Sequence, residues 1–187
     1  MRAAIILAAG ASRRFGHRDK LKVRLGARSL LDHAIANARA AGATRILLVS
    51  SRRARMIGVT VVHAPRTRDG LSASLAAGLA ALRPIEREAL IFLADMPFAR
   101  APRLRLPPGA DAARPRFQGR PGHPVLVRTQ SAIARLGRGD AGLGGALQTV
   151  FVPGTAAHLL DIDTPAELRR ARHHGSRALR SRSALDR

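Results

Sequence analysis

Residues 3–8 read AAIILA, a short apolar run, and the overlapping stretch LAAGASRRFGHRDK at residues 7–20 is rich in glycine, serine and arginine. A continuous apolar run of this length, followed by such a polar segment, is typical of a central strand in a parallel sheet, because both faces of that strand are covered. We therefore predict that the chain begins with a buried strand and that the polar segment is a loop at its carboxyl end.

Further strands and helices are predicted in alternation after this first strand, which indicates an α/β fold. Predicted strands are residues 46–49, 59–62, 89–94, 124–127, 149–152 and 158–162, and predicted helices are residues 30–38, 72–82, 130–136 and a last one that begins at Thr164-Pro165-Ala166-Glu167. Ser29 is placed to cap the first helix and Gly42 to terminate it. The proline-rich segment 100–116 is predicted to be a loop. The expected fold is one doubly wound, mostly parallel α/β sheet flanked by helices.

The composition narrows the functional classes. The 187 residues fit one domain, expected over residues 1–172, with a basic and poorly ordered tail over 173–187. The absence of cysteine excludes disulfides, thiolate metal sites and cysteine nucleophiles. No apolar run reaches the ~18 residues of a membrane span. The N-terminal run is too short for a convincing export signal, so a cytoplasmic location is expected.

The charge balance points to an anionic ligand. The chain has 33 Lys and Arg against 12 Asp and Glu, a net charge of +21. The basic residues are spread over the whole chain, and without Tyr or Trp and with five Phe there is little surface on which bases could stack. We therefore expect a small anion such as a nucleotide rather than a specific nucleic acid. A non-enzymatic, basic nucleic-acid-binding protein is kept as an alternative.

The loop at residues 7–20 combines the features that a polyphosphate needs. Gly10 and Gly16 let the backbone approach a ligand, Ser12 offers a hydroxyl, and Arg14 and Lys20 bring positive charge. The loop matches neither the GxxxxGK[ST] nor the GxGxxG pattern. An ordinary glycine turn in an arginine-rich chain is the alternative reading.

Three of the few acidic residues lie at the ends of predicted strands. Asp95 comes directly after the strand at residues 89–94, and Asp161 and Asp163 lie two positions apart, on one face of a strand. Carboxylates at this edge of a sheet could hold Mg²⁺ against phosphate oxygens. The alternative is that Asp163 only helps to start the helix that follows. His123, in the rigid loop GRPGHP at residues 119–124, could face a ligand, although a lone loop histidine is more often solvated.

Six motifs, taken in order, resemble those of MobA-like nucleotidyltransferases, and they look most similar to molybdenum cofactor cytidylyltransferases. The motifs are LAAG with SRRFG and Lys20, GLSASLAAGL at 70–79, DMP at 95–97, GRPGHPV at 119–125, GDAG at 139–142 and DIDTPAEL at 161–168. The chain departs from the family pattern in two shortened segments, 50–69 and 98–118, and the second of these separates DMP from GHP.

The resemblance implies a Rossmann-like sheet flanked by helices and a Mg²⁺-dependent enzyme that transfers CMP from CTP to molybdopterin and releases pyrophosphate. A molybdoenzyme or an insertion chaperone would be a further partner. It implies nucleotide binding by Leu7, Ala8, Ala9, Gly10, Ser12, Arg14, Lys20, Gly70, Ser72 and Ser74. It implies catalytic roles for Arg14, Lys20 and Asp95, and metal ligation by Asp95 and Asp163. Arg120, His123 and Asp140 would face the acceptor. Transfer to another phosphorylated acceptor, such as a sugar phosphate, or from GTP, is the alternative within this enzyme class.

Overall fold

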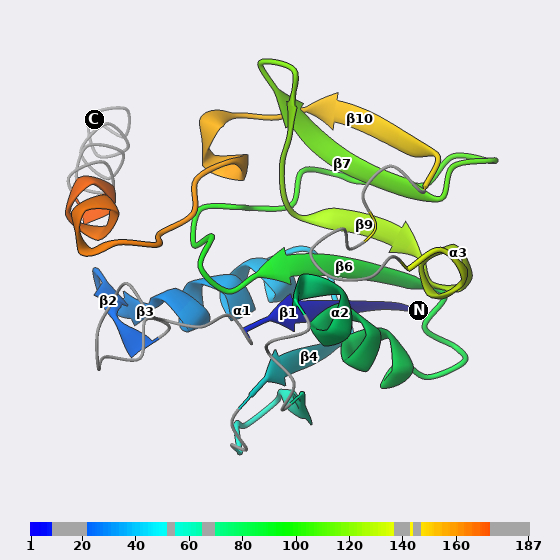
Figure 1. Ribbon diagram of the computed structural model, residues 1–187, viewed down its shortest axis with the longest axis horizontal. Helices are drawn as coiled ribbons and strands as arrows, with labels where there is room; N and C mark the ends of the chain where they lie inside the picture. Colours follow the sequence, from blue (N-terminus) through cyan, green and yellow to red (C-terminus); the bar gives the residue numbers. More distant parts are fainter. Residues whose placement is uncertain (9–21, 52–54, 65–69, 137–142, 144–146, 173–187) are drawn as a thin grey trace, which may run out of the picture.

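A mixed sheet forms the centre of the molecule (Figure 1). The computed structural model describes residues 1–8, 22–51, 55–64, 70–136, 143 and 147–172. Within these residues, the strands of the sheet lie in the order β10-β7-β9-β6-β1-β4-β5, with β8 paired to β7. Their bounds are β1 Arg2–Leu7, β4 Arg45–Ser50, β5 Thr60–His63, β6 Glu88–Leu93, β7 Ala112–Phe117, β8 Arg120–Pro121, β9 Val125–Arg128 and β10 Thr149–Pro153.

The sheet is mostly parallel, as predicted. Strands β5, β4, β1 and β6 run in one direction, and β9 is antiparallel to both β6 and β7. Strand β10 pairs with β7 in parallel, so the long strands other than β9 share one direction. The carboxyl ends of β1, β6 and β7 therefore lie at the same edge of the sheet.

The side chains of β1 alternate between two apolar cores, one on each face of the sheet. Ala4 and Ile6 pack with α1 (Leu30–Ala40) on one face, while Ile5 and Leu7 pack with α2 (Gly70–Ala80) on the other. Ile5 and Ile6 are completely buried. This double coverage explains why the strand is apolar throughout rather than alternating.

The helix boundaries follow the capping residues. The Ser29 hydroxyl accepts from the backbone N–H of Asp32, and the Asp32 carboxylate accepts from the backbone N–H of Ser29, so a capping box starts α1. Gly42, with φ of 77°, follows its end, as predicted. The other described helical segments are α3 (Thr129–Ala134), the short turn η5 (Ala156–His158) and residues 165–172.

A third, smaller core anchors the end of the described chain. Leu25 of the hairpin β2 (Arg24–Leu25) and β3 (Arg28–Ser29) packs with Leu30, Ile162, Leu168 and Ala171. Residues 165–172 are thereby held against the start of α1. Figure 1 shows this helix beside the β2–β3 hairpin.

Two of the predicted elements are wrong. The segment 100–116 is not a loop throughout, because its end forms β7. The strand was not predicted because it contains Pro115, and proline is uncommon inside strands. In the structure β7 pairs with β9 only at Ala112 and Ala113, so the missing N–H of Pro115 removes no hydrogen bond to β9. The predicted strand at 158–162 is instead the end of η5 followed by irregular chain.

The expected tail, residues 173–187, lies outside the described residues. None of the helices in the described part of the chain combines the length and the apolar character needed to cross a bilayer.

Candidate functional site

At β1 the order in which the chain adds strands to the sheet reverses, from one side of this strand to the other. From β1 the chain passes to β4 and β5 on one side, and then returns to place β6 on the other side of β1. In open α/β sheets, ligands bind at the carboxyl ends of the strands beside such a point. At this edge the backbone N–H of Ala94 donates to the Leu7 carbonyl at 3.1 Å, and that of Ala8 donates to the Val49 carbonyl at 2.9 Å.

The predicted nucleotide loop leaves the sheet at this point. Leu7 is the last residue of β1 and Ala8 follows it, beside β4 and β6. The other predicted residues of this loop lie outside the described residues: Ala9, Gly10, Ser12, Arg14 and Lys20. The structure therefore places the start of the loop at the expected edge of the sheet.

Helix α2 directs its N-terminus toward the same edge, because it follows β5 and the carboxyl ends of parallel strands lie there. An α-helix N-terminus carries partial positive charge and exposed N–H groups, which suit an anion. Gly70 is the first residue of α2, and Ser72 and Ser74 in its first turns are buried. The helix lies very close to the sheet: a Cβ on Gly78 would come within 2.6 Å of Ile5 Cγ2.

Asp95 meets the segment that contains Asp161 and Asp163. The backbone N–H of Ile162, which stands between these two aspartates, donates to the Asp95 carbonyl at 3.0 Å. The Ile162 side chain is completely buried in the third core. Although the predicted strand is absent here, the burial of Ile162 and its backbone bond to Asp95 bring its acidic neighbours to the end of β6.

The electrostatics of Asp161 reflect this arrangement. Partial burial raises the pKa of the Asp161 carboxyl above its ordinary value. A hydrogen bond with its own backbone opposes this shift, whereas the negative charges of Asp163, Asp95 and Glu167 raise the pKa of Asp161 further. Asp161 therefore interacts electrostatically with three other carboxyl groups at this edge of the sheet.

The acidic residues suit a hard divalent cation that is also bound by substrate. Carboxylate oxygens are the protein ligands that Mg²⁺ and Mn²⁺ prefer, and Mg²⁺ in phosphate-transfer sites is commonly held by one or two carboxylates plus substrate phosphates. Within the described ranges, no cluster of three or more His, Asp or Glu side chains is arranged to hold a metal ion. Two carboxylates would leave the other positions on such an ion to phosphate oxygens and water.

Glu167 orders the backbone beside Asp163. Its Oε2 atom accepts hydrogen bonds from the backbone N–H groups of Asp163 and Thr164, at 2.7 and 2.8 Å. The Thr164 hydroxyl accepts in return from the Glu167 N–H at 3.2 Å, which confirms the predicted helix start. These bonds, first of all the one from Asp163, lower the pKa of Glu167. Sequence reasoning identified the cap but missed the bond to Asp163, for which no sequence signal exists.

His123 is enclosed rather than solvated. It precedes β9 by two residues, and its backbone N–H donates to the His158 carbonyl at 2.9 Å. Its Nδ1 atom is buried and has no hydrogen-bond partner among the described residues. Burial, and secondly the positive charge of Arg114, lower the pKa of His123 to about 4, so the ring is neutral at pH 7. The expectation that a loop histidine is solvated is therefore wrong here.

Of the two other residues predicted to face the acceptor, the structure describes one. Arg120 is exposed in β8, beside the carboxyl end of β7, which is the same sheet edge as Asp95. Asp140 lies outside the described residues. In the described part of the chain, this edge thus brings together the N-terminus of α2, the exposed Arg120 and a group of carboxylates, which suits the binding of a phosphate with a divalent cation.

Comparisons with known proteins agree with this geometry. The family model "MobA-like NTP transferase domain" matches residues 4–155. A search of curated proteins found no significant match.

Three proteins of known structure illustrate the shared fold. Rv0371c from Mycobacterium tuberculosis H37Rv is 26% identical, with 92% of this chain and 97% of that chain covered and a TM-score of 0.74. A manganese complex of the same mycobacterial protein gives 21% identity, coverage of 92% and 98%, and a TM-score of 0.67. The 2-C-methyl-D-erythritol 4-phosphate cytidylyltransferase from Thermus thermophilus is 18% identical, with 92% of this chain and 98% of that chain covered and a TM-score of 0.68. Molybdopterin-guanine dinucleotide biosynthesis protein A from Archaeoglobus fulgidus is 18% identical, with 95% of this chain and 100% of that chain covered and a TM-score of 0.58.

Proposed function

This chain belongs to the MobA-like NTP transferase domain family, and on that premise we propose that it transfers CMP from CTP to the terminal phosphate of molybdopterin. Family membership makes the chain a nucleotidyltransferase, while the base and the acceptor are the content of the proposal. In the reaction, an acceptor phosphate oxygen forms a bond to the α-phosphorus of CTP. The bond from that phosphorus to the bridging oxygen breaks, and pyrophosphate leaves.

The observation that carries the proposal is the contact between Asp95 and the 161–163 segment at the carboxyl end of β6. A nucleotide entering beside β1 would have its base and ribose near Leu7, Ala8, Ala9 and Gly10, with Gly70, Ser72 and Ser74 of α2 on the other side. Its phosphates would then extend toward the carboxylates. Ser12, Arg14 and Lys20, in the loop after β1, would bind the triphosphate.

Mg²⁺ fits the residues present at this edge. Asp95 and Asp163 would hold the ion, with the nucleotide phosphates supplying its other ligands. When bound, the ion would neutralise phosphate charge and polarise the α-phosphate. The manganese complex of the mycobacterial relative supports the choice of a divalent cation.

The protein's own contribution would be alignment and charge neutralisation. Arg14 and Lys20 would stabilise the negative charge that develops on the departing pyrophosphate. Arg120, His123 and Asp140 would orient the acceptor, and a neutral His123 could hydrogen-bond it without adding charge. Attack in line needs no nucleophilic side chain, which agrees with the absence of cysteine.

One assay tests the proposal: pyrophosphate release from CTP, GTP, ATP and UTP with Mg²⁺, with and without molybdopterin. We expect release from CTP that depends on molybdopterin. Preference for GTP would contradict the choice of base, and release without dependence on molybdopterin would contradict the choice of acceptor. Lys20→Ala should raise the KM for CTP, and an unchanged KM would contradict the role of Lys20.

A second candidate is cytidylyl transfer to a phosphorylated sugar or sugar alcohol. The structure is more similar to the Thermus thermophilus cytidylyltransferase, with a TM-score of 0.68, than to the Archaeoglobus fulgidus protein, with 0.58. The same assay with 2-C-methyl-D-erythritol 4-phosphate as acceptor distinguishes the two candidates.

A further inference from the structure

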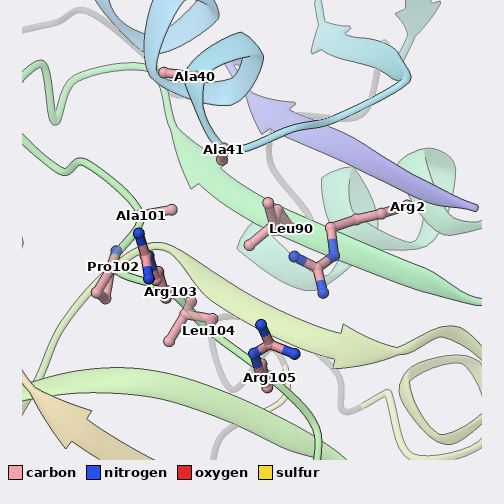
Figure 2. A pocket seen from close by; sticks show the side chains of 9 residues that line it. All are labelled: Arg2, Ala40, Ala41, Leu90, Ala101, Pro102, Arg103, Leu104 and Arg105. Atoms are coloured by element: carbon pink, nitrogen blue, oxygen red, sulfur yellow. The ribbon is translucent and has the colours of Figure 1, made fainter.

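A pocket opens on the α1 face at the opposite edge of the sheet from the nucleotide site (Figure 2). Arg2, the first residue of β1, and Ala40 and Ala41 at the end of α1 line one side, and residues 101–105 line the other. Leu90, near the middle of β6, is also part of its lining. Its volume of about 460 Å³ falls in the range of small-molecule sites, about 300–1,000 Å³.

The segment 101–105 presents two arginines to this pocket because of how Leu104 packs. Leu104 is 3% exposed and belongs to the core on the α1 face. Arg103 and Arg105, on either side of the buried Leu104, are both exposed and both line the pocket. Pro102 restricts the backbone ahead of them, and its carbonyl accepts from the Leu104 N–H at 2.6 Å.

Of the three arginines around the pocket, one is paired with a carboxylate and two are not. Arg2 is held by Glu88, with Nε and Nη2 at 3.0 and 2.7 Å from Oε2. Arg103 and Arg105 are exposed, and neither forms a hydrogen bond or an ion pair within the described part of the chain. Among the described lining residues none is acidic. The rim therefore carries two uncompensated positive charges, while Leu90, Leu104 and the alanines supply an apolar wall.

We propose that this pocket is a second ligand site, which binds a small phosphomonoester with an apolar body. A phosphomonoester carries about −1.5 to −2 charge at pH 7, which matches the charge of Arg103 and Arg105. Guanidinium groups bind phosphate through paired, charge-assisted hydrogen bonds. The apolar body would lie against Leu90 and the alanines. Figure 2 shows the three arginine side chains around Leu90 and Leu104.

Calorimetric titration tests the proposal with phenyl phosphate as probe and with its two component parts, inorganic phosphate and phenol, measured separately. Phenyl phosphate should bind the full chain more tightly than either part. The double variant Arg103→Ala/Arg105→Ala should weaken its binding by more than about tenfold, because two charge-assisted donors are lost. Both side chains are exposed, so this variant should keep the wild-type Tm.

Two further variants make the test decisive. Arg170→Ala removes an exposed arginine from the helix at 165–172, outside the pocket, and should leave binding unchanged. Ala101→Leu fills the pocket but keeps both arginines, so it should weaken phenyl phosphate more than inorganic phosphate. Wild-type affinity in the double variant, an equal loss in Arg170→Ala, or equal binding of phenyl phosphate and inorganic phosphate by the wild type would overturn the proposal. None of these readouts depends on nucleotide transfer.

Discussion

The backbone N–H of Ile162 lies 3.0 Å from the carbonyl oxygen of Asp95, and this hydrogen bond joins two segments that are far apart in the sequence. It places Asp161 and Asp163 next to the end of β6. The buried Ile162 side chain prevents the segment from moving away, because that would expose an apolar group. The acidic edge of the sheet therefore depends on a packing contact as well as on its carboxylates.

Asp95→Asn should reduce pyrophosphate release by at least about 100-fold while leaving the fold intact. The substitution keeps the size of the side chain but removes the charge that would hold the divalent cation. Asp111→Asn is the matched control, because Asp111 precedes β7 at the other edge of the sheet and should keep its activity. Near-normal turnover in Asp95→Asn would exclude Asp95 as a metal ligand.

Asp161→Asn should stabilise the protein at pH 7. Because the pKa of Asp161 is raised in the folded state, the folded chain keeps a proton that the unfolded chain has already released, so the free energy of unfolding falls as the pH rises through this range. Asn cannot release a proton, so the variant does not lose stability in this way as the pH rises. Chemical denaturation of the wild type and the variant at several pH values measures the difference in the free energy of unfolding.

Asp32→Asn is the control of opposite sign. The Ser29 hydroxyl lowers the pKa of Asp32, so its charge stabilises the folded state above the ordinary Asp range, and the variant should be less stable at pH 7. If Asp161→Asn is no more stable than the wild type at pH 7, the raised pKa assigned to Asp161 from burial and from the neighbouring carboxylates is wrong.

Glu167→Ala should raise the Mg²⁺ concentration needed for half-maximal activity by several-fold. Glu167 accepts from the Asp163 N–H at 2.7 Å, so its loss would let the Asp163 backbone move. Glu167→Gln keeps an acceptor oxygen and should restore much of the metal response. If Glu167→Ala has an unchanged Mg²⁺ dependence and only a lower Tm, Glu167 caps the helix but does not position Asp163.

His123 should make the protein less stable in mild acid. The pKa of His123 is about 4 in the folded protein against an ordinary value of 6.5, so only the unfolded chain takes up a proton between these values. The free energy of unfolding should therefore fall as the pH drops from 6.5 to 4. His123→Gln should flatten this dependence, whereas His63→Gln, at an exposed position on β5, serves as control. Equal slopes in wild type and His123→Gln would contradict the burial argument.

Gly78→Ala should lower the free energy of unfolding by about 1–3 kcal/mol, although alanine favours helices. The new Cβ would lie 2.6 Å from Ile5 Cγ2 and 3.0 Å from Val49 Cγ2, and both partners are completely buried. Ala80→Gly, at an exposed position of α2, should cost about 1 kcal/mol or less. A Gly78→Ala variant as stable as the wild type would show that the contact between α2 and the sheet can relax.

Local pattern alone determined much of this protein. The apolar run of β1, the Ser29 cap, the Thr164–Glu167 helix start and the placing of Asp95 after a strand were all readable, because each depends on residues within a few positions of one another. The ordered motifs likewise indicated the family. Strand β7 was not predicted because it contains Pro115, and a proline argues against a strand when the neighbouring strands are unknown.

Only the tertiary structure decided which distant groups meet. The sequence could not show that Ile162 would bond to Asp95, that the His158 carbonyl and Arg114 would surround His123, or that Arg103 and Arg105 would face Arg2 across a pocket. These contacts form only when the cores on the two faces of the sheet and the small core around Ile162 are packed and water is excluded from them. Such burial is a property of the whole packed chain and of no single segment.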